Sequence, residues 1–176
     1  MQGYFGVGLE KSSKPMNAGN LFRTAHAFGA SFLFTVSAVY SVNKGKSDTS
    51  AAPHNIPWYD FSSARDLKLP GGCVLVGVEF SEDALELPVF RHPSNAAYIL
   101  GPEIGSLSPE ILQRCQHIVK IPSSFCLNVA TTGAIVLYDR IRTRGNYGER
   151  PVSITGESLP PLEHVQGVAI RRKQKK

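Results

Sequence analysis

The stretch Ile99-Leu-Gly-Pro-Glu-Ile-Gly105 decides the fold, together with its counterpart Ile121-Pro-Ser-Ser-Phe-Cys-Leu-Asn-Val-Ala130. Each stretch begins as an apolar run and stops abruptly in small and turn-forming residues. Such runs are typical of buried parallel strands, and the carboxyl ends of parallel strands meet at one edge of a sheet. We therefore predict two neighbouring strand ends whose loops together hold one small ligand.

The rest of the chain continues this alternation of strands and helices. Apolar runs predict strands at residues 4–9, 31–36, 73–78, 96–100 and 118–121. Apolar spacing and capping residues predict helices at 15–28, 60–67, 109–114 and 127–142. Residues 40–57, which are rich in Ser, Asn, Lys, Gly and Pro, predict a long surface loop. The pattern indicates an α/β fold with a mostly parallel sheet flanked by helices.

The length and the cysteines limit the class of protein. A chain of 176 residues fits one domain with a sizeable core. Cys73, Cys115 and Cys126 are odd in number and lack metal-type spacing, so we expect neither a disulfide framework nor a metal site. The sequence shows no targeting segment and no apolar run long enough to cross a bilayer. We expect a cytoplasmic protein that does not enter membranes.

The net charge of +5 resides in one place, because residues 171–176 alone carry five positive charges. We divide the chain into a domain at 1–158 and a basic, disordered tail at 159–176, which is either a solvated end or an arm on nucleic-acid phosphates. A second basic stretch, around Arg140 to Arg150, surrounds Tyr147 at the end of a predicted helix. Arginines near an aromatic residue suit RNA, although they also suit a helix C-terminus.

Three motifs carry a specific resemblance. Asn17-Ala-Gly-Asn-Leu-Phe-Arg-Thr-Ala25, Leu100-Gly-Pro-Glu-Ile-Gly-Ser-Leu-Ser108, and Ile121-Pro with Leu127-Asn-Val-Ala130 resemble, in this order, the SpoU/TrmH family of SPOUT RNA methyltransferases. The resemblance covers about residues 3–142 and is strongest to minimal members that act on tRNA. It implies a deep C-terminal trefoil knot, a homodimer, S-adenosylmethionine as cofactor, and transfer of its methyl group to a ribose 2′-hydroxyl.

Glycines and a proline after the strands let backbone groups approach a ligand, whereas a plain strand-to-helix turn is the alternative. The resemblance implies that the cofactor is bound by Val78, Glu79, Leu100, Gly101, Pro102, Glu103, Gly105, Ile121, Pro122, Cys126 and Leu127. Two residues depart from the family pattern, because most members have a serine in place of Cys126 and a glycine in place of Ser106. We interpret Cys126 as a small buried apolar residue rather than a nucleophile.

The resemblance implies a catalytic set of Arg23, Asn20, Asn128 and Glu103. The family is often described as using the arginine as the base that removes the 2′-hydroxyl proton. An arginine pKa above 12 makes that role difficult, so Arg23 either takes the proton or orients a phosphate. Asn128 positions the hydroxyl or caps a helix, and Glu103 has backbone amides as its alternative partners.

The substrate RNA is expected to contact the first motif, the long loop and the basic stretch, through Asn17, Arg23, Lys44, Lys46, His54, Arg142 and Arg144. A non-catalytic RNA-binding protein on the same knotted fold is the alternative function. A Rossmann-type nucleotide enzyme is disfavoured, because no Gly-x-Gly-x-x-Gly follows the first strand. The scattered histidines pair with no serine or cysteine at motif spacing, which gives a hydrolase little support.

Overall fold

The structure, a computed structural model, describes residues 3–39, 55–145 and 154. Its strands are β1 (Phe5–Glu10), β2 (Phe32–Val36), β3 (Trp58–Phe61), β4 (Val74–Val78), β5 (Leu85–Glu86), β6 (Ala96–Leu100) and β7 (His117–Lys120). Its helices are α1 (Pro15–Ala27), α3 (Pro109–Arg114), α4 (Val129–Arg144) and the short 3-10 helix η2 (Leu87–Val89). The strands form one sheet in the order β3-β2-β1-β6-β4-β7-β5, and every pair in it is parallel. The predicted α/β class is confirmed.

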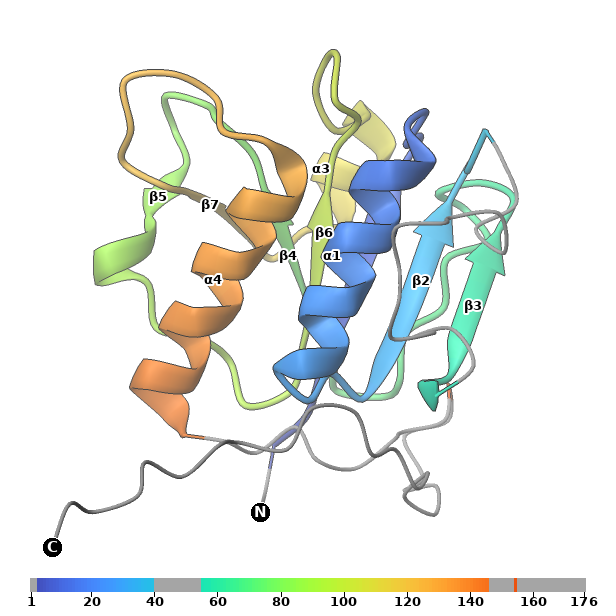
Figure 1. The fold of residues 1–176 in the computed structure, drawn as a ribbon, viewed down its shortest axis with the longest axis horizontal. Coiled ribbons are helices and arrows are strands. Elements are labelled where there is room, and N and C mark those ends of the chain that lie inside the picture. Colours follow the sequence, from blue (N-terminus) through green and yellow to red (C-terminus); the bar gives the residue numbers. More distant parts are fainter. Residues whose placement is uncertain (1–2, 40–54, 146–153, 155–176) are drawn as a thin grey trace, which may run out of the picture.

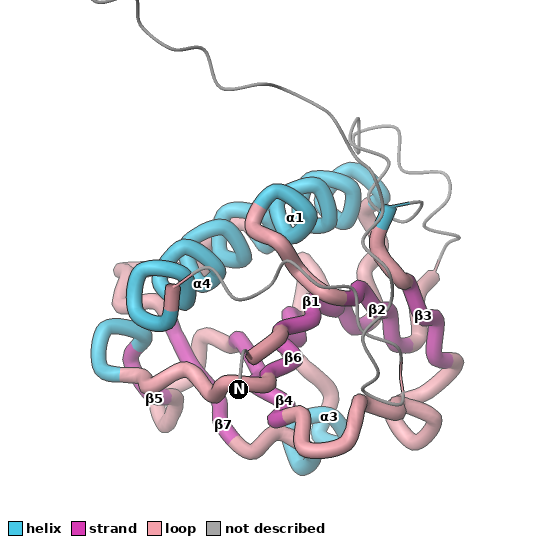
Figure 2. The backbone as a smooth tube through the Cα atoms, turned by 90° about the horizontal axis from the view of Figure 1, so that it is seen from below, coloured by secondary structure: helices cyan, strands magenta, loops and turns pink. Residues whose placement is uncertain are grey.

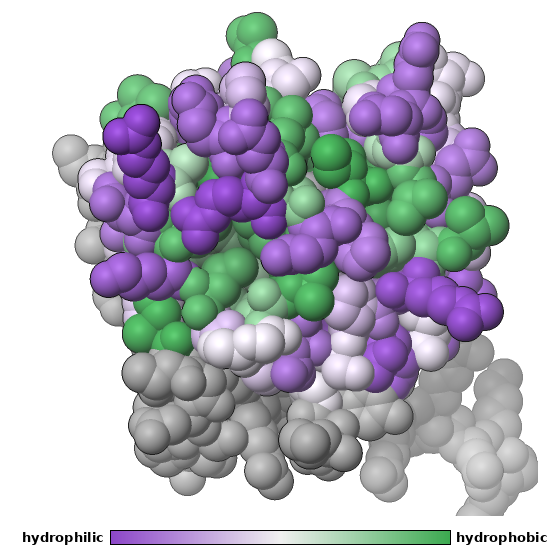
Figure 3. Space-filling model, turned by 180° about the vertical axis from the view of Figure 1, so that it is seen from behind, coloured by the Kyte–Doolittle hydropathy of each residue, from purple (hydrophilic) through white to green (hydrophobic). Residues whose placement is uncertain are grey.

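Helices cover both faces of the sheet. Helices α1 and α4 lie side by side on one face, and α3 lies on the other (Figures 1 and 2). The first face buries a core that includes Leu21 and Phe22 of α1 and Leu137 of α4, whereas the second buries a separate cluster that includes Phe34 of β2 and Ile111 of α3. On the α3 side of the molecule, polar and apolar side chains are interspersed over the surface (Figure 3).

The two long helices approach each other closely at Gly133. A Cβ atom on Gly133 would lie 2.1 Å from the Cδ1 atom of Leu21, which is fully buried. Glycine at this position therefore allows α4 to pack directly against α1. Each helix begins with a recognisable signal, because Pro15 occupies the first turn of α1 and the Oδ1 atom of Asn128 accepts the Ala130 N–H at 2.9 Å to cap α4.

The register aligns the carboxyl ends of the central strands. Leu100 at the end of β6 pairs with Leu9 of β1 on one side and with Val78 of β4 on the other. Val78 in turn pairs with Val119 of β7. The loops that follow β1, β4, β6 and β7 therefore leave the sheet at the same edge, which is the upper edge in Figure 1.

Two predictions of the local structure are wrong. The helix expected at 60–67 is absent: Trp58–Phe61 form strand β3, which pairs with β2, and a turn follows. In this turn the Asp66 carboxylate accepts hydrogen bonds from the hydroxyls of Ser62 and Ser63 at 2.6 and 2.7 Å. Pairing with a neighbouring strand overrides the local helical pattern here.

The carboxyl ends of β6 and β7, which were predicted to be neighbours, are also not adjacent, because β4 lies between these two strands. A third loop, starting at Glu79, therefore separates them. The other predicted strands and helices are present with ends shifted by at most two residues, and β6 has the predicted bounds. Among the described residues, no helix is long and apolar enough to cross a membrane.

Candidate active site

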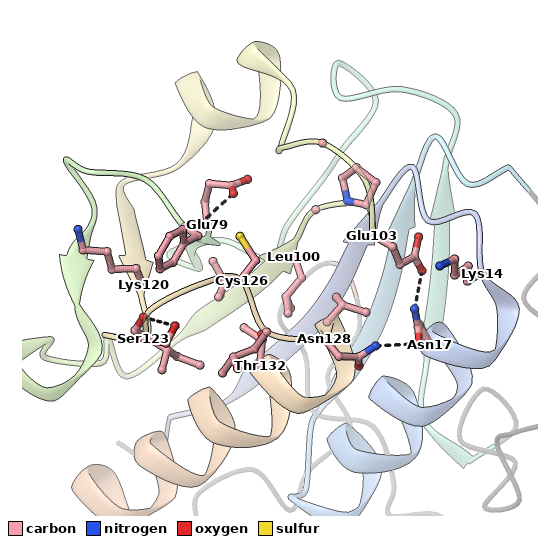
Figure 4. Close-up of a pocket in the computed structure, with 18 residues that line it drawn as sticks. Lys14, Asn17, Glu79, Leu100, Glu103, Lys120, Ser123, Cys126, Asn128 and Thr132 are labelled. Carbon is pink, nitrogen blue, oxygen red and sulfur yellow. Dashed lines mark hydrogen bonds between the residues drawn. The ribbon is translucent and has the colours of Figure 1, made fainter.

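A cavity of about 380 Å³ opens at the carboxyl edge of the sheet (Figure 4). Its walls come from the loops after β4, β6 and β7 and from the first turns of α1 and α4. All the predicted cofactor-binding residues except Pro122 line it: Val78, Glu79, Leu100, Gly101, Pro102, Glu103, Gly105, Ile121, Cys126 and Leu127. Pro122 lines an adjoining hollow instead. The fold thus brings together predicted cofactor-binding residues that lie as many as 49 positions apart in the sequence, from Val78 to Leu127.

Glu103 forms the centre of the polar end of this cavity. Its Oε1 atom accepts hydrogen bonds from the Ser12 hydroxyl at 3.1 Å and from the Asn17 amide at 3.2 Å. Its Oε2 atom accepts from the N–H and the hydroxyl of Ser13 at 3.3 and 3.2 Å. Burial alone would raise the pKa of Glu103, but hydrogen bonds from its own N–H, Ser13, Asn17 and Ser12 outweigh burial and hold the pKa below its ordinary value.

Asn17 and Asn128 join the two helix starts across the cavity. The Asn128 Nδ2 group donates to Asn17 Oδ1 at 3.2 Å, and Asn17 Nδ2 donates to Glu103 (Figure 4). Asn128 also caps α4, so the capping interpretation is confirmed and leaves its amide facing the cavity. One chain of hydrogen bonds therefore connects the β6 loop, α1 and α4.

Glu79 and Lys120 shape the opposite end of the cavity. The Glu79 carboxylate accepts the backbone N–H groups of Phe80 at 2.9 Å and Leu107 at 2.8 Å, which ties the β4 loop to the β6 loop. The Lys120 ammonium donates to the carbonyls of Ser81 and Glu82, both at 3.0 Å. Both charged groups are thus used mainly to hold backbone in place.

Gly105 turns the β6 loop with a φ of +100°, a conformation that a residue with a Cβ atom rarely adopts. Ser106, the departure next to it, is exposed. Cys126 is also exposed and its side chain lines the cavity, so our interpretation of it as a buried residue is wrong. The reason is that the β7 loop runs along the cavity rim rather than under the sheet.

Arg23 and Asn20 do not line the cavity formed by their own chain. Both are exposed on α1, on the stripe that also includes Met16 and Ala27. Only Asn17, one turn earlier, reaches the cavity. Within one chain, the cavity therefore does not include Arg23, and the catalytic role of Arg23 stays a prediction.

The described arginines of the basic stretch, Arg140, Arg142 and Arg144, lie at the far end of α4, roughly 15 Å from the cavity along the helix axis. Arg142 pairs with Asp139 at 2.9 Å, and Arg144 donates to the His92 carbonyl and the Ser94 hydroxyl. Arg140 is 2% exposed and cannot contact RNA. Arg142 and Arg144 therefore do not line the cavity, and their contact with RNA stays a prediction.

Several residues of the cavity were not predicted from the sequence, namely Lys14, Phe80, Lys120, Ser123, Val129 and Thr132. Phe80 and Ser123 directly extend predicted loops, and proximity to the strand ends was a signal that could have identified them. Lys44, Lys46, His54 and the tail at 159–176 lie outside the described residues. Within the described part of the chain, no group of His, Cys, Asp or Glu side chains could hold a metal ion.

A family model described as the SpoU rRNA Methylase family matches residues 4–138. Among curated proteins, the tRNA (guanosine(18)-2'-O)-methyltransferase of Escherichia coli K12 is 26% identical over 151 residues, which cover 81% of this chain and 65% of that protein. The mouse tRNA (guanosine(18)-2'-O)-methyltransferase TARBP1 is 26% identical over 140 residues, 73% of this chain and 9% of the mouse protein. The chain therefore spans less than two thirds of the length of either relative.

Solved structures share the fold. The SpoU methyltransferase AviRb from Streptomyces viridochromogenes, in complex with the cofactor AdoMet, has a TM-score of 0.70 at 25% identity and covers 82% of this chain and 59% of its own. The TrmH/SpoU tRNA modifying enzyme of A. aeolicus has a TM-score of 0.69 at 20% identity, with 84% and 79% of the two chains covered. At 20% identity, the likeness to the A. aeolicus enzyme supports the fold alone.

Proposed function

Because the chain belongs to the SpoU rRNA methylase family, whose model matches residues 4–138, we propose that it transfers a methyl group from S-adenosylmethionine to a ribose 2′-hydroxyl of tRNA. The cavity at the carboxyl edge of the sheet is the observation that carries this proposal. The name of the E. coli relative, which is a tRNA 2'-O-methyltransferase, supports the substrate. The AdoMet complex of AviRb supports the cofactor.

The residues of the cavity fit this cofactor. When bound, S-adenosylmethionine supplies a methyl group on a positively charged sulfonium. Val78, Leu100 and Leu127 would hold its apolar parts, and a volume of about 380 Å³ lies within the range of small-molecule pockets. Glu103, whose pKa is below its ordinary value, stays ionised at neutral pH and complements the positive charge. No metal and no covalent enzyme intermediate enter this proposal.

We assign the acceptor side of the reaction to the polar end of the cavity. The amide of Asn128 and the carboxylate of Glu103 stand there to orient the ribose hydroxyl. Arg23 and Asn20 complete the catalytic set: Arg23 either holds an RNA phosphate through a bidentate contact of its guanidinium, or receives the hydroxyl proton in its neutral guanidine form. Alignment of the two reactants supplies most of the rate enhancement.

Because Arg23 does not line the cavity of its own chain, we place it in the cavity of a second copy. The neighbouring stripes of α1 and α4 support a homodimer: Met16, Ile135 and Tyr138 are 67%, 37% and 61% exposed, which is unusual for large apolar side chains grouped on adjacent helices. In such a dimer each active site is complete only when the partner contributes its arginine.

Mixing two inactive variants tests this arrangement. Arg23→Ala removes the arginine, and Thr132→Phe fills the cavity from the first turn of α4. After subunit exchange, half of the dimers are mixed and each has one complete site, so we expect about a quarter of the wild-type activity. Activity that stays at the level of the separate variants would place the arginine in its own chain's site instead. Arg65→Ala, an exposed arginine outside the cavity, serves as the control.

The enzymatic proposal is tested with S-adenosylmethionine labelled in its methyl group and bulk tRNA. We expect label in RNA, and in dinucleotides that survive alkali, because a methylated 2′-oxygen cannot attack the adjacent phosphate. The Arg23→Ala variant should lose turnover and keep most of its RNA affinity. Label-free RNA, with RNA binding intact, would support the alternative of a non-catalytic RNA-binding protein, for which the departure at Cys126 leaves room.

Three further proposals concern the location of the protein, its topology and the limits of its domain. We propose a cytoplasmic location, supported by three free thiols at Cys73, Cys115 and Cys126. We propose the C-terminal trefoil knot of the SPOUT fold, supported by the insertion of β4 between β6 and β7 while both of their loops close on one cavity. We propose that residues 1–158 form the catalytic domain, and that the tail at 159–176 adds RNA affinity through its positive charges.

A further inference from the structure

Lys14 is an unusual residue for its place in the fold. It occupies the N-cap of α1, directly before Pro15, and its side chain makes no capping hydrogen bond. The side chains preferred at this position carry an acceptor oxygen, and a positive charge is disfavoured at the positive end of the helix dipole. The first turn of α1 also contains no acidic residue that would compensate the charge. Departures from local rules concentrate at functional sites.

Lys14 also belongs to the cavity. It lines the polar end, beside Glu103 and Asn17, and its side chain is exposed to solvent (Figure 4). Both oxygens of the nearby Glu103 carboxylate already accept hydrogen bonds from Ser12, Ser13 and Asn17. In the described part of the chain, Lys14 takes part in none of the ion pairs. A positive charge is therefore available at the mouth of the cavity.

The chemistry of the ribose that accepts the methyl group indicates which anion the positive charge of Lys14 binds. In an RNA chain, the carbon that bears the 2′-hydroxyl adjoins the carbon that bears the 3′-phosphate, so an anion accompanies every reacting hydroxyl within a few bond lengths. A lysine side chain at the polar end can reach it as a mobile point charge. We propose that Lys14 binds the RNA phosphate next to the ribose to be methylated and thereby positions that ribose. The proposal rests on the proposed function of the cavity.

The test uses Lys14→Asn, because asparagine is a good N-cap residue and removes the charge. We expect the melting temperature to rise by about 2 to 4 °C as the cap improves. We expect RNA affinity to fall about tenfold, as for the loss of one charged hydrogen bond, and the slope of log affinity against log salt to fall by about 1. The affinity for S-adenosylmethionine should be unchanged. Lys68→Asn, an exposed lysine outside the cavity, is the matched control.

A variant that is more stable but binds RNA less tightly supports a role in substrate binding, and Lys14→Arg should restore most of the affinity because it retains the charge. Unchanged RNA affinity and salt slope would overturn the proposal. Weaker binding of S-adenosylmethionine would also overturn it and assign Lys14 to the cofactor carboxylate. Since the readouts are binding and stability, they remain informative if the protein transfers no methyl group, which would contradict the proposed function alone.

Discussion

Replacing Glu103 with glutamine should destabilise the protein in a manner that depends on pH. The carboxylate accepts four hydrogen bonds, three that tie the β6 loop to the segment before α1 and one from Asn17 in the first turn of α1. Glutamine keeps one acceptor oxygen for Ser12 and Asn17, but it presents an NH₂ group where Oε2 accepts from Ser13. The Ser13 hydroxyl can reverse its role, whereas the Ser13 backbone N–H cannot and must turn to water.

The loss in free energy of unfolding follows from this count of hydrogen bonds. Loss of the protein acceptor for the Ser13 N–H costs about 1 kcal/mol, since Ser13 is exposed and water substitutes in part. The two retained bonds change from charged to neutral and lose about 0.5 kcal/mol each. We therefore expect the free energy of unfolding of Glu103→Gln to be about 2 kcal/mol lower than that of the wild type at neutral pH.

The pKa of Glu103 is lowered by folding, so its ionised form stabilises the protein above the pKa of the unfolded state. That contribution is lost as the pH falls through the lower pKa of the folded state. Urea unfolding at about pH 7 and about pH 3.5 should therefore give a large difference between wild type and variant at the first pH and a smaller one at the second. A difference independent of pH, or none at pH 7, would refute the reasoning. Glu82→Gln, an exposed glutamate, is the control.

Two further substitutions test the packing that holds the cavity. Arg140→Met should lower the free energy of unfolding by about 3 to 5 kcal/mol, because the carbonyls of Pro93 and Ser94, each 2.7 Å from the buried guanidinium, lose a charged donor; a loss under about 1 kcal/mol in urea unfolding would contradict this. Gly8→Ala should lower the melting temperature, with a cost of about 1 to 3 kcal/mol, since its Cβ would lie 2.3 Å from the buried ring of Phe34; an unchanged temperature would show that the ring moves away freely.

The sequence predicts the fold well where burial is strong. Strand β6 is predicted residue for residue, because Ala96–Leu100 are buried on both faces and form an uninterrupted apolar run. Strand β3 is missed because its existence depends on pairing with β2, a contact between distant parts of the chain. Strand order is missed for the same kind of reason: hydrophobic periodicity indicates which side chains are buried and not which strand lies alongside.

Residues of the candidate site are likewise predicted where they belong to a motif and missed where only the fold brings them to the cavity. Glu103 and Asn128 are predicted because they stand in motifs after strand ends, and the register brings those ends to one edge. Lys14 belongs to no motif, and it lines the cavity only because the fold places the start of α1 beside the strand loops. Arg140 shows the opposite error: its charge predicts an RNA contact, but the side chain is 2% exposed and binds backbone carbonyls, which a count of charges along the chain cannot reveal.

The central claim is that the cavity at the carboxyl edge binds S-adenosylmethionine, and calorimetric titration with this molecule tests it most directly. The wild type should bind, whereas Thr132→Phe should lose binding because the ring occupies the cavity. The matched control Thr143→Phe, exposed near the far end of α4, should bind like the wild type. Absence of binding to the wild type, or equal binding to a folded Thr132→Phe variant, would contradict the account.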